Sequence, residues 1–275
     1  MSHPKIDDVR KALVAKPDAP FDLSKRDSGD RSLFPNKKEA RTSLTKDAAV
    51  INELQDKLYA NRDRALLVVL QGMDTAGKCG VIRNVFADTS PLGMQVRAFK
   101  APSKTELAHD YLWRIHDAVP RKGRIGVFDR SHYEDVLVVK VRNFAPADIV
   151  EQRYEQINAF EKHLSENGVT ILKFMLNVGY EEQGIRLRER LTEPHKLWKF
   201  NPGDLEDRKL WPDFMSAYET AVQRCSTPHA PWYVVPADSR TRRNAMIARI
   251  VRGALEDMNL SWPDPGHKAD DFDFD

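Results

Sequence analysis

The residues best suited to chemistry form two short strings, and each string directly follows an apolar run. The first string, 72–80, reads GMDTAGKCG and satisfies the pattern G-x-x-x-x-G-K between the apolar run 66–70 and a helix-like segment. Glycines permit a tight turn whose N–H groups surround a phosphate, and the lysine adds a mobile cation. We therefore predict a phosphate-binding loop; the alternative is a glycine turn that merely reverses the chain. The predicted phosphate ligands of the loop are Gly72, Gly77, Lys78 and Gly80.

Two positions depart from the usual nucleoside-triphosphate loop. Position 79 is Cys, where Ser or Thr normally offers a hydroxyl to magnesium. Asp74 lies inside the loop, where its charge repels phosphate unless the carboxylate holds a divalent cation. We interpret Asp74 as a ligand of Mg²⁺, or of Mn²⁺, because oxygen ligands suit both metals. The alternative is that Asp74 only caps the loop through its own backbone.

The second string begins with Asp129 and Arg130, at the end of the apolar run 125–128. Ligands of an open parallel sheet gather at the carboxyl ends of its strands. We therefore expect Asp129 to lie on the same edge as the loop and to complete the metal site with Asp74. Arg130 suits a bidentate grip on phosphate oxygens. The alternative for this string is a surface Asp–Arg pair that ends a strand.

Two other residues near these strings have two interpretations each. Lys100 follows the apolar run 96–99, so it becomes a candidate phosphate contact if that run is a neighbouring strand. The alternative for Lys100 is a solvated face. His132 lies two residues after Arg130 and fits a packing role as well as a phosphate contact.

Residues 183–212 carry seven cations against five acids, and two prolines interrupt them. A basic helical hairpin after the fourth strand suits a lid that closes over phosphates and excludes water. Arg186 and Arg190 are one helical turn apart and share a face, so we predict that both contact phosphate. The alternative is an ordinary solvated hairpin. We interpret Trp198, Phe200 and Trp211 as hinge or core-packing residues rather than base-stacking surfaces.

The elements that must position these residues follow from an alternation of short apolar runs and longer amphipathic segments. The apolar runs are 66–70, 96–99, 125–128, 170–176 and 232–235. The helix-like segments between and after them are 77–88, 104–118, 148–166, 205–226 and 239–258. Short β-branched or aromatic runs separated by helices predict a parallel sheet that is covered on both faces. The fold class is therefore α/β.

Three parts are expected along the chain. Residues 1–62 form an irregular, proline-interrupted arm wrapped over the body, followed by a helix that starts near Ser43 or Thr45. Residues 63–260 are expected to form the α/β domain that carries the phosphate loop, with the lid at about 183–212. Residues 261–275 are expected to be an acidic, disordered tail, because they combine several Asp with little apolar content.

Composition excludes several classes of protein. The 275 residues are 41% hydrophobic, which is enough to bury a sizeable core. Lys and Arg number 43 against 41 acids, a balance that argues against a nucleic-acid coat. No apolar run approaches the length of a membrane span, and the amino-terminal stretch lacks a secretory signal. Two cysteines cannot build a disulfide framework. We expect a soluble, cytoplasmic protein.

Five separated strings, in order, resemble the polyphosphate kinase 2 family. The strings are 72–80 GMDTAGKCG, 99–103 FKAPS, 128–137 FDRSHYEDVL, 198–205 WKFNPGDL and 230–238 APWYVVPAD. The resemblance covers roughly residues 40 to 258. It implies a P-loop kinase-like three-layer α/β/α sandwich with a central parallel sheet, a helical lid and an N-terminal extension. It further implies reversible, magnesium-dependent phosphoryl transfer between inorganic polyphosphate and adenine nucleotides, in a homo-oligomer (dimer or tetramer).

The resemblance also assigns roles to residues. It implies that Asp74 and Asp129 hold the metal and that Arg186 and Arg190 make the lid's closing contacts. The residues that it places in the reaction itself are Asp74, Lys78, Asp129 and Arg130. The family motif leaves position 79 variable, so Cys79 does not contradict it. The strings 129–135 and 230–238 resemble members that accept nucleoside monophosphates, so AMP and then ADP are the expected acceptors.

Two other functions remain open from the residues. An ATP-dependent kinase of a small molecule or nucleotide would use the same loop and lid. A switch-like nucleotide-binding module is the other alternative. A guanine-reading Asn-Lys-x-Asp string should follow the loop of a GTPase, but the nearest string, 36–39 NKKE, precedes the loop and lacks the Asp.

Overall fold

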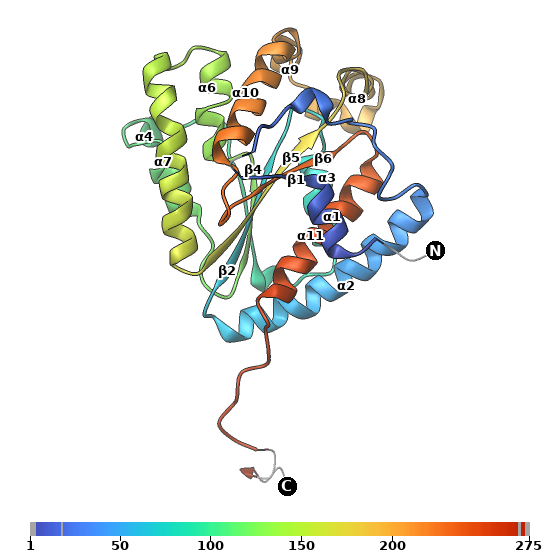
Figure 1. The fold of residues 1–275 in the computed structure, drawn as a ribbon, viewed down its shortest axis with the longest axis vertical. Helices are drawn as coiled ribbons and strands as arrows, with labels where there is room; N and C mark the ends of the chain where they lie inside the picture. The colour runs from blue at the N-terminus through green and yellow to red at the C-terminus, as the bar shows by residue number, and fades with distance from the viewer. Residues whose placement is uncertain (1–3, 18, 269–270, 273–275) are drawn as a thin grey trace.

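A six-stranded, mostly parallel sheet forms the centre of the molecule (Figure 1). The computed structural model describes residues 4–17, 19–268 and 271–272. The strands are β1 (Val14–Ala15), β2 (Ala65–Gln71), β3 (Met94–Ala98), β4 (Ile125–Asp129), β5 (Val169–Asn177) and β6 (Trp232–Pro236). Their order is β1-β6-β5-β2-β4-β3, with β2 to β6 parallel and β1 antiparallel to β6. The five strands predicted from apolar runs are confirmed.

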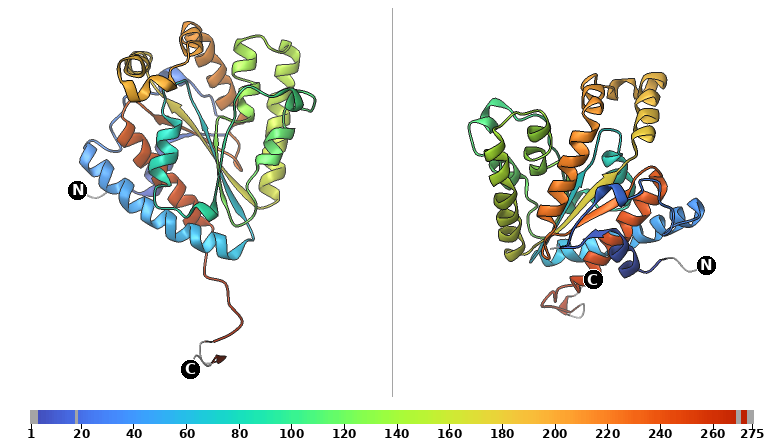
Figure 2. Two further views of the ribbon diagram at one scale, coloured as in Figure 1. Left: turned by 180° about the vertical axis from the view of Figure 1, so that it is seen from behind. Right: turned by 45° about the horizontal axis from the view of Figure 1, so that its top comes forward.

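Helices pack on both sides of this sheet. They are α1 (Ile6–Leu13), α2 (Lys37–Asn61), α3 (Lys78–Val85), α4 (Lys104–Leu107), α5 (Trp113–Ala118), α6 (Val138–Val141), α7 (Ala147–Glu166), α8 (Tyr180–Thr192), α9 (Gly203–Lys209), α10 (Trp211–Cys225) and α11 (Arg240–Asp257). Figure 2 shows α7 and α10 on one side of the strands and α2, α3 and α11 on the other. All seven residues of β2 are buried, which explains why this strand reads as a continuous apolar run.

Two helices predicted as continuous are divided. The segment 104–118 splits into α4 and α5 because the Asp110 carboxylate accepts the N–H of Leu112 at 3.0 Å, an Asx turn that interrupts the helical ladder. The segment 205–226 splits into α9 and α10 at Leu210, and Pro212 lies in the first turn of the new helix. Proline is tolerated at that position because the first N–H groups of a helix have no partner inside it.

The amino-terminal segment is more regular than predicted. The irregular arm contains α1, and α2 begins at Lys37 rather than near Ser43. The Asn36 side chain caps α2 by accepting the N–H of Lys38 at 2.8 Å. The arm lies against the body, as expected, because β1 pairs with β6 and Arg249 donates to the carbonyl of Pro4 at 3.0 Å.

The carboxyl-terminal segment leaves the body after α11 (Figure 1). Residues 261–268 form neither helix nor strand, and Trp262 is exposed. Part of the predicted acidic tail, residues 269–270 and 273–275, lies outside the described residues. Among the residues that the structure describes, no helix combines the length and the apolar character needed to cross a bilayer.

The predicted lid region contains α8, a 3₁₀ turn (Pro194–Lys199) and α9, which stand together at the top of Figure 1. Trp211 packs edge-on against Tyr180, with ring centroids 5.3 Å apart, as expected for a packing residue. Of the two roles expected for Trp198, core packing is wrong, because its side chain is 79% exposed in the 3₁₀ turn; the hinge role stays a prediction. The ammonium of Lys199 lies over its face, 5.0 Å from the ring centroid.

Candidate active site

The phosphate loop joins the carboxyl end of β2 to the first turn of α3. Gly77 has φ +104° and forms the left-handed N-cap of α3, while Gly72 has φ +150°. A Cβ on Gly77 would collide with the guanidinium of Arg243, and one on Gly72 would lie 2.8 Å from the carbonyl oxygen of Leu176. Both positions therefore require glycine. Lys78 is buried, and its ammonium donates to the carbonyl of Gly72 at 2.8 Å, which folds the side chain back over the loop.

The register between β2 and β4 brings the second string beside this loop. Leu70 pairs with Asp129, and the N–H of Arg130 donates to the carbonyl of Leu70 at 3.0 Å. Cys79, at the start of α3, donates its thiol to Oδ2 of Asp129 at 3.3 Å. Burial and the charge of Asp129 raise the pKa of the Cys79 thiol, so the sulfur remains a protonated donor at neutral pH. The two strings that the sequence singles out thus meet at one edge of the sheet.

Arg130 joins the loop to the end of β4. Its Nη2 lies 2.6 Å from Oδ1 of Asp74, and its Nη1 lies 3.2 Å from Oε2 of Glu134. Burial opposes the charge of Arg130, but Glu134 and Asp74 outweigh it and raise the pKa of the guanidinium. The backbone of Arg130 has φ +66°, a left-handed conformation that is uncommon for a non-glycine residue and often found at functional sites.

Positive and negative side chains lie together in the group formed by Asp74, Lys78, Asp129 and Arg130. Burial raises the pKa of Asp74, but the charges of Arg130, Lys78 and Arg190 outweigh it, and the net shift is downward. Burial and the charge of Arg130 lower the pKa of Lys78, while Asp74 and Asp129 oppose that shift. The carboxylate of Asp74 is therefore ionised at neutral pH and available as a ligand.

The donor atoms in this group suit a magnesium ion. Mg²⁺ is usually bound through one or two carboxylates, with water and substrate phosphates completing its shell. Asp74 and Asp129 supply that number of carboxylates beside the phosphate loop. In the described part of the chain, no group of three or more His, Cys, Asp or Glu side chains could enclose a metal by itself. The set therefore fits a metal held jointly with phosphate rather than a closed structural site.

Arg190 extends from α8 toward the loop. Its Nη1 lies 2.6 Å from Oδ2 of Asp204 in α9, and its charge contributes to the lowered pKa of Asp74. Burial and the charge of Asp74 raise the pKa of Asp204 to about 6. The charge of Arg190 thus acts on Asp74 in the phosphate loop, while its contact with phosphate stays a prediction. Asp204, which the sequence reasoning missed, binds this arginine from the other arm of the lid.

The side chain of Arg186 is not positioned to contact phosphate from the lid. It is 3% exposed, and its side chain donates to Glu182 and to four backbone carbonyls. Those acceptors belong to Thr75, Ala76, Ala237 and Asp238, at 3.0, 3.3, 2.8 and 2.8 Å. Because its donors are occupied, the predicted phosphate contact of Arg186 is replaced by a structural role. It ties the phosphate loop to the segment that follows β6.

Arg243 in α11 is a second buried cation behind the loop, and the sequence reasoning missed it. Its Nη1 donates to the carbonyl of Ala76 at 2.7 Å, and its other groups reach Oδ1 of Asn244. Burial and the charges of Arg186 and Arg240 lower its pKa. Gly80 leaves room for it, because a Cβ there would lie 3.1 Å from Nη2. Two arginines therefore place positive charge directly behind the loop.

Lys100 lies just beyond the carboxyl end of β3, at the edge of the sheet and two strands away from β2. Its side chain is exposed, and its carbonyl accepts Nη1 of Arg114 at 2.9 Å. The structure thus puts Lys100 on the correct edge of the sheet but does not bring it into the ion-paired group around the loop. Its role as a phosphate contact stays a prediction.

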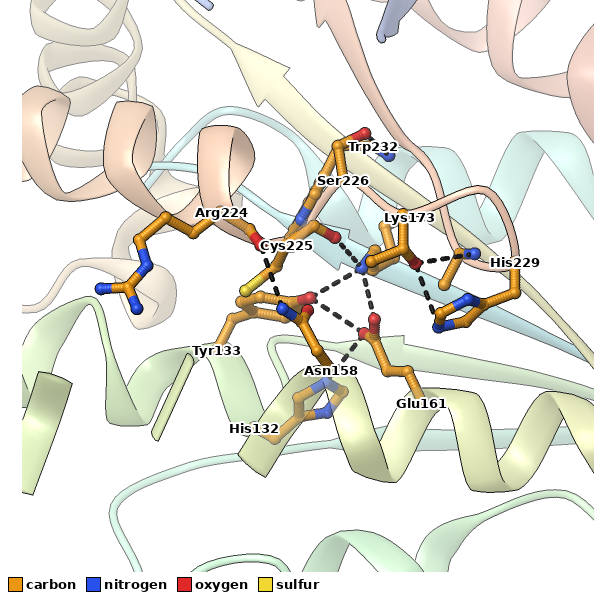
Figure 3. Close-up of polar contacts among 12 residues, drawn as sticks. His132, Tyr133, Asn158, Glu161, Lys173, Arg224, Cys225, Ser226, His229 and Trp232 are labelled. Carbon is orange, nitrogen blue, oxygen red and sulfur yellow. Dashed lines mark hydrogen bonds and ion pairs between the residues drawn. The ribbon is translucent and has the colours of Figure 1, made fainter. Parts of the chain in front are cut away.

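A buried polar network lies behind the turn His132–Asp135 (Figure 3). The Lys173 ammonium donates to Glu161 at 2.5 Å, to the Tyr133 hydroxyl at 2.7 Å and to the carbonyl of Cys225 at 2.6 Å. Nε2 of His132 lies 3.1 Å from Oε1 of Glu161. His132 is 1% exposed, so of its two interpretations the packing role is the one observed.

A cavity of about 480 Å³ adjoins the outer side of α3. It lies between α2, α3 and the first turns of α11, and Arg41 and Arg240 are its cations. Asn84, Asn244 and Thr241 add polar groups to its wall. Asp88 places an acid in the same wall, so the charges that line this cavity are mixed.

Several known proteins are similar to this chain in sequence and fold. A relative from Meiothermus ruber, named AMP/ADP-polyphosphate phosphotransferase, is 46% identical over 93% of this chain and 96% of its own length. Another from Rhodopseudomonas palustris, named ADP-polyphosphate phosphotransferase, is 39% identical over 88% of each chain. The crystal structure of polyphosphate kinase 2 from Arthrobacter aurescens matches with a TM-score of 0.93 and 39% identity. That match covers 98% of this chain and 96% of the other.

The model of the polyphosphate kinase 2 family matches residues 35–263. That range includes the loop, the carboxyl end of β4, the lid and the buried network described above. The chain belongs to the polyphosphate kinase 2 family.

Proposed function

We propose that this protein transfers a phosphoryl group from inorganic polyphosphate to AMP and to ADP, reversibly and with magnesium. The observation that carries the proposal is the group of Asp74, Lys78, Asp129 and Arg130 at one edge of the sheet. The names of the relatives from Meiothermus ruber and Rhodopseudomonas palustris support polyphosphate as the donor. The first of these names also supports AMP together with ADP as the acceptors.

The chemistry needs positioning and charge rather than a strong base. The attacking oxygen of a nucleotide phosphate is already anionic at neutral pH, so proton removal is not required. Lys78, Arg130 and the backbone N–H groups of the loop offset charge on the transferring group. Arg190 adds a cation from the lid, and closure of α8 and α9 would exclude water that competes with the nucleotide. The product is again a phosphoanhydride, so the reaction runs in both directions.

Asp74 and Asp129 would hold the metal, which when bound neutralises charge on phosphate oxygens and orients them. Burial raises the pKa of Asp74, but the charges of Arg130, Lys78 and Arg190 outweigh it and keep the carboxylate ionised for this task. The thiol of Cys79 donates to Asp129 and so fixes the orientation of that carboxylate. We choose Mg²⁺, with Mn²⁺ able to replace it, because carboxylate ligands suit both ions.

The remaining parts of the proposal concern architecture. We interpret the sheet, loop and hairpin as a P-loop kinase-like sandwich with a lid, which the match to the Arthrobacter aurescens structure supports. A dimer or tetramer stays a prediction, to be checked by light scattering at several protein concentrations. Lys100 is kept as a candidate contact for the donor chain.

The test is product analysis by anion-exchange chromatography. The protein is mixed with long-chain polyphosphate, magnesium and either AMP or ADP, and a Lys78→Ala variant serves as the blank. We expect ADP and then ATP from AMP, and ATP from ADP. Formation of ATP from ADP alone would keep the reaction and remove AMP as an acceptor. If polyphosphate is inert while ATP phosphorylates a non-nucleotide acceptor, the protein is an ATP-dependent kinase instead.

A further inference from the structure

A cluster of cations lies at the edge of the sheet opposite the phosphate loop. Arg62 follows the last turn of α2, and Arg121, Lys122 and Arg124 lie in the turn that precedes β4. Together with Tyr59 they line a cavity of about 370 Å³. Among the residues that the structure describes, no acid lines this cavity. We call these five residues the rear cationic site.

The four charges of this site are not balanced by acids. Within the described residues, none of the four side chains forms an ion pair or donates a hydrogen bond, whereas neighbouring Arg64 pairs with Asp63 at 2.9 Å. Like charges gathered around one cavity repel one another, and a bound anion relieves that repulsion. The arrangement is therefore typical of an anion site rather than of a surface with mixed charges.

The backbone holds these cations in place. Arg62 caps α2 in a left-handed conformation, φ +54°, and its guanidinium carbon lies 5.6 Å from the ring centroid of Tyr59. Gly123, with φ +85°, reverses the chain between Lys122 and Arg124, and its N–H donates to the carbonyl of Arg64 at 2.7 Å. The end of α2 and the turn 121–124 are thereby fixed to the start of the sheet. Binding of a ligand therefore requires little ordering of the backbone.

The chemistry of the site selects a phosphate-rich polyanion. Three of its four cations are guanidinium groups, which grip phosphate oxygens in bidentate fashion. We propose that the rear cationic site binds a distal segment of a long polyphosphate chain whose end is being used at the phosphate loop, and this rests on the proposed function. The two sites lie at opposite ends of β2, whose seven residues span roughly 20 Å at about 3.3 Å per residue.

Attachment at a second site raises the local concentration of donor ends near the loop without changing the chemical step. Long chains that reach both sites should therefore show a lower KM than short donors, at an unchanged kcat. Tripolyphosphate is too short to reach both sites, so its use should not depend on the rear cationic site.

The experiment uses the full chain with Arg121→Gln, Lys122→Gln and Arg124→Gln combined. The matched control is Lys5→Gln, Lys11→Gln and Lys16→Gln, which removes the same charge from exposed residues of the amino-terminal arm. We expect the KM for long-chain polyphosphate to rise about tenfold in the first variant only, since removing phosphate contacts weakens polyanion binding steeply. kcat and the KM for tripolyphosphate should stay unchanged. A variant with Arg121→Lys and Arg124→Lys keeps the charge and should show a smaller rise in the KM for long-chain polyphosphate, since an ammonium attracts phosphate but does not grip it in bidentate fashion.

An unchanged KM for long-chain polyphosphate in the first variant overturns the inference, and so do two other kinetic outcomes. An equal rise in KM for both donors, or an equal effect in the control variant, would mean that only overall charge matters. Binding of fluorescent long-chain polyphosphate is measured alongside activity, at two salt concentrations and in the absence of nucleotide. Loss of that binding in a protein that shows no polyphosphate-dependent activity would contradict the proposed function but keep the site. Tighter binding of an RNA oligonucleotide than of polyphosphate would overturn the choice of ligand.

Discussion

Nη2 of Arg130 lies 2.6 Å from Oδ1 of Asp74, so a cation from the end of β4 and a carboxylate from the phosphate loop form one ion pair. The two residues are distant in sequence, yet the register of β2 against β4 brings them together. Because both are largely buried, neither charge is well solvated, and each depends on the other and on the ligands of the site.

Asp74→Asn tests the metal role of this carboxylate. We expect the magnesium concentration for half-maximal rate to rise by about tenfold or more, the scale typical of altered metal sites. Magnesium titration at saturating polyphosphate and nucleotide measures the shift. Glu134→Gln, which removes the other acid bound to Arg130, is the control and should leave the magnesium requirement unchanged. An unchanged rate and magnesium dependence in Asp74→Asn would leave only the backbone-capping role.

Arg186→Lys and Arg190→Lys should separate structure from catalysis in the lid. Arg186 donates to four carbonyls, and losing several of these bonds should cost about 2–3 kcal/mol in the free energy of unfolding. Arg190→Lys should change stability by less than about 0.5 kcal/mol. Its kcat should nonetheless fall by about a hundredfold, since a lysine cannot reproduce a guanidinium aimed at transition-state charge. Urea denaturation and steady-state kinetics measure both effects. A large loss of kcat in Arg186→Lys, together with a large loss of stability in Arg190→Lys, would instead make Arg186 the catalytic residue of the lid.

The buried pair Lys173 and Glu161 should show strong coupling. Both side chains are fully buried, 2.5 Å apart, so Lys173→Met leaves an unpaired carboxylate and should cost about 3–5 kcal/mol. The double variant Glu161→Leu with Lys173→Met removes both charges and should be more stable than Lys173→Met alone. A double-mutant cycle in urea measures the difference. Simple additivity of the two substitutions would show that the pair is not coupled.

Asp135 should make stability depend on pH. Burial, only partly offset by Arg153 and Arg114, raises the pKa of its carboxyl to about 6. Since the folded protein binds this proton more tightly than the unfolded chain, the contribution of Asp135 to stability is fully present only below about pH 4 and is lost as the pH rises through about 6. The variant Asp135→Asn should therefore gain stability relative to wild type between pH 4 and pH 7, by about 2–3 kcal/mol. Urea denaturation across that range measures it, and a constant difference between the two proteins would contradict the raised pKa.

Much of the fold could be predicted because its signals are local. Buried parallel strands read as continuous apolar runs, and the loop pattern lies within nine residues between such a strand and a helix. The start of α2 also had a readable signal in Asn36, a favoured N-cap residue followed by Glu39. An N-cap residue can be identified only once the helix that follows it has been predicted. The prolines near Asn36 favoured an irregular arm over a helix at this position, so the cap was not recognised.

The parts of the site that were missed depend on tertiary contacts. Arg243 belongs to α11 and meets Ala76 across more than half of the chain, with no motif to mark it. Glu161 lies on α7, where a charged residue normally indicates a solvated face. Arg186 and Arg190 share a helix face by spacing, but only packing decides that one is buried under carbonyls and the other reaches Asp204.

The short strand β1 protects the edge of the sheet. Val14 and Ala15 pair with Tyr233 and Trp232, and they cover the open side of β6 with main-chain hydrogen bonds. An uncovered strand with the sequence of β6, Trp-Tyr-Val-Val-Pro, would present a flat, apolar edge to other chains. The amino-terminal arm therefore blocks pairing of β6 with a strand of another molecule. Deleting the arm should promote aggregation, even though the phosphate loop and the lid are unchanged.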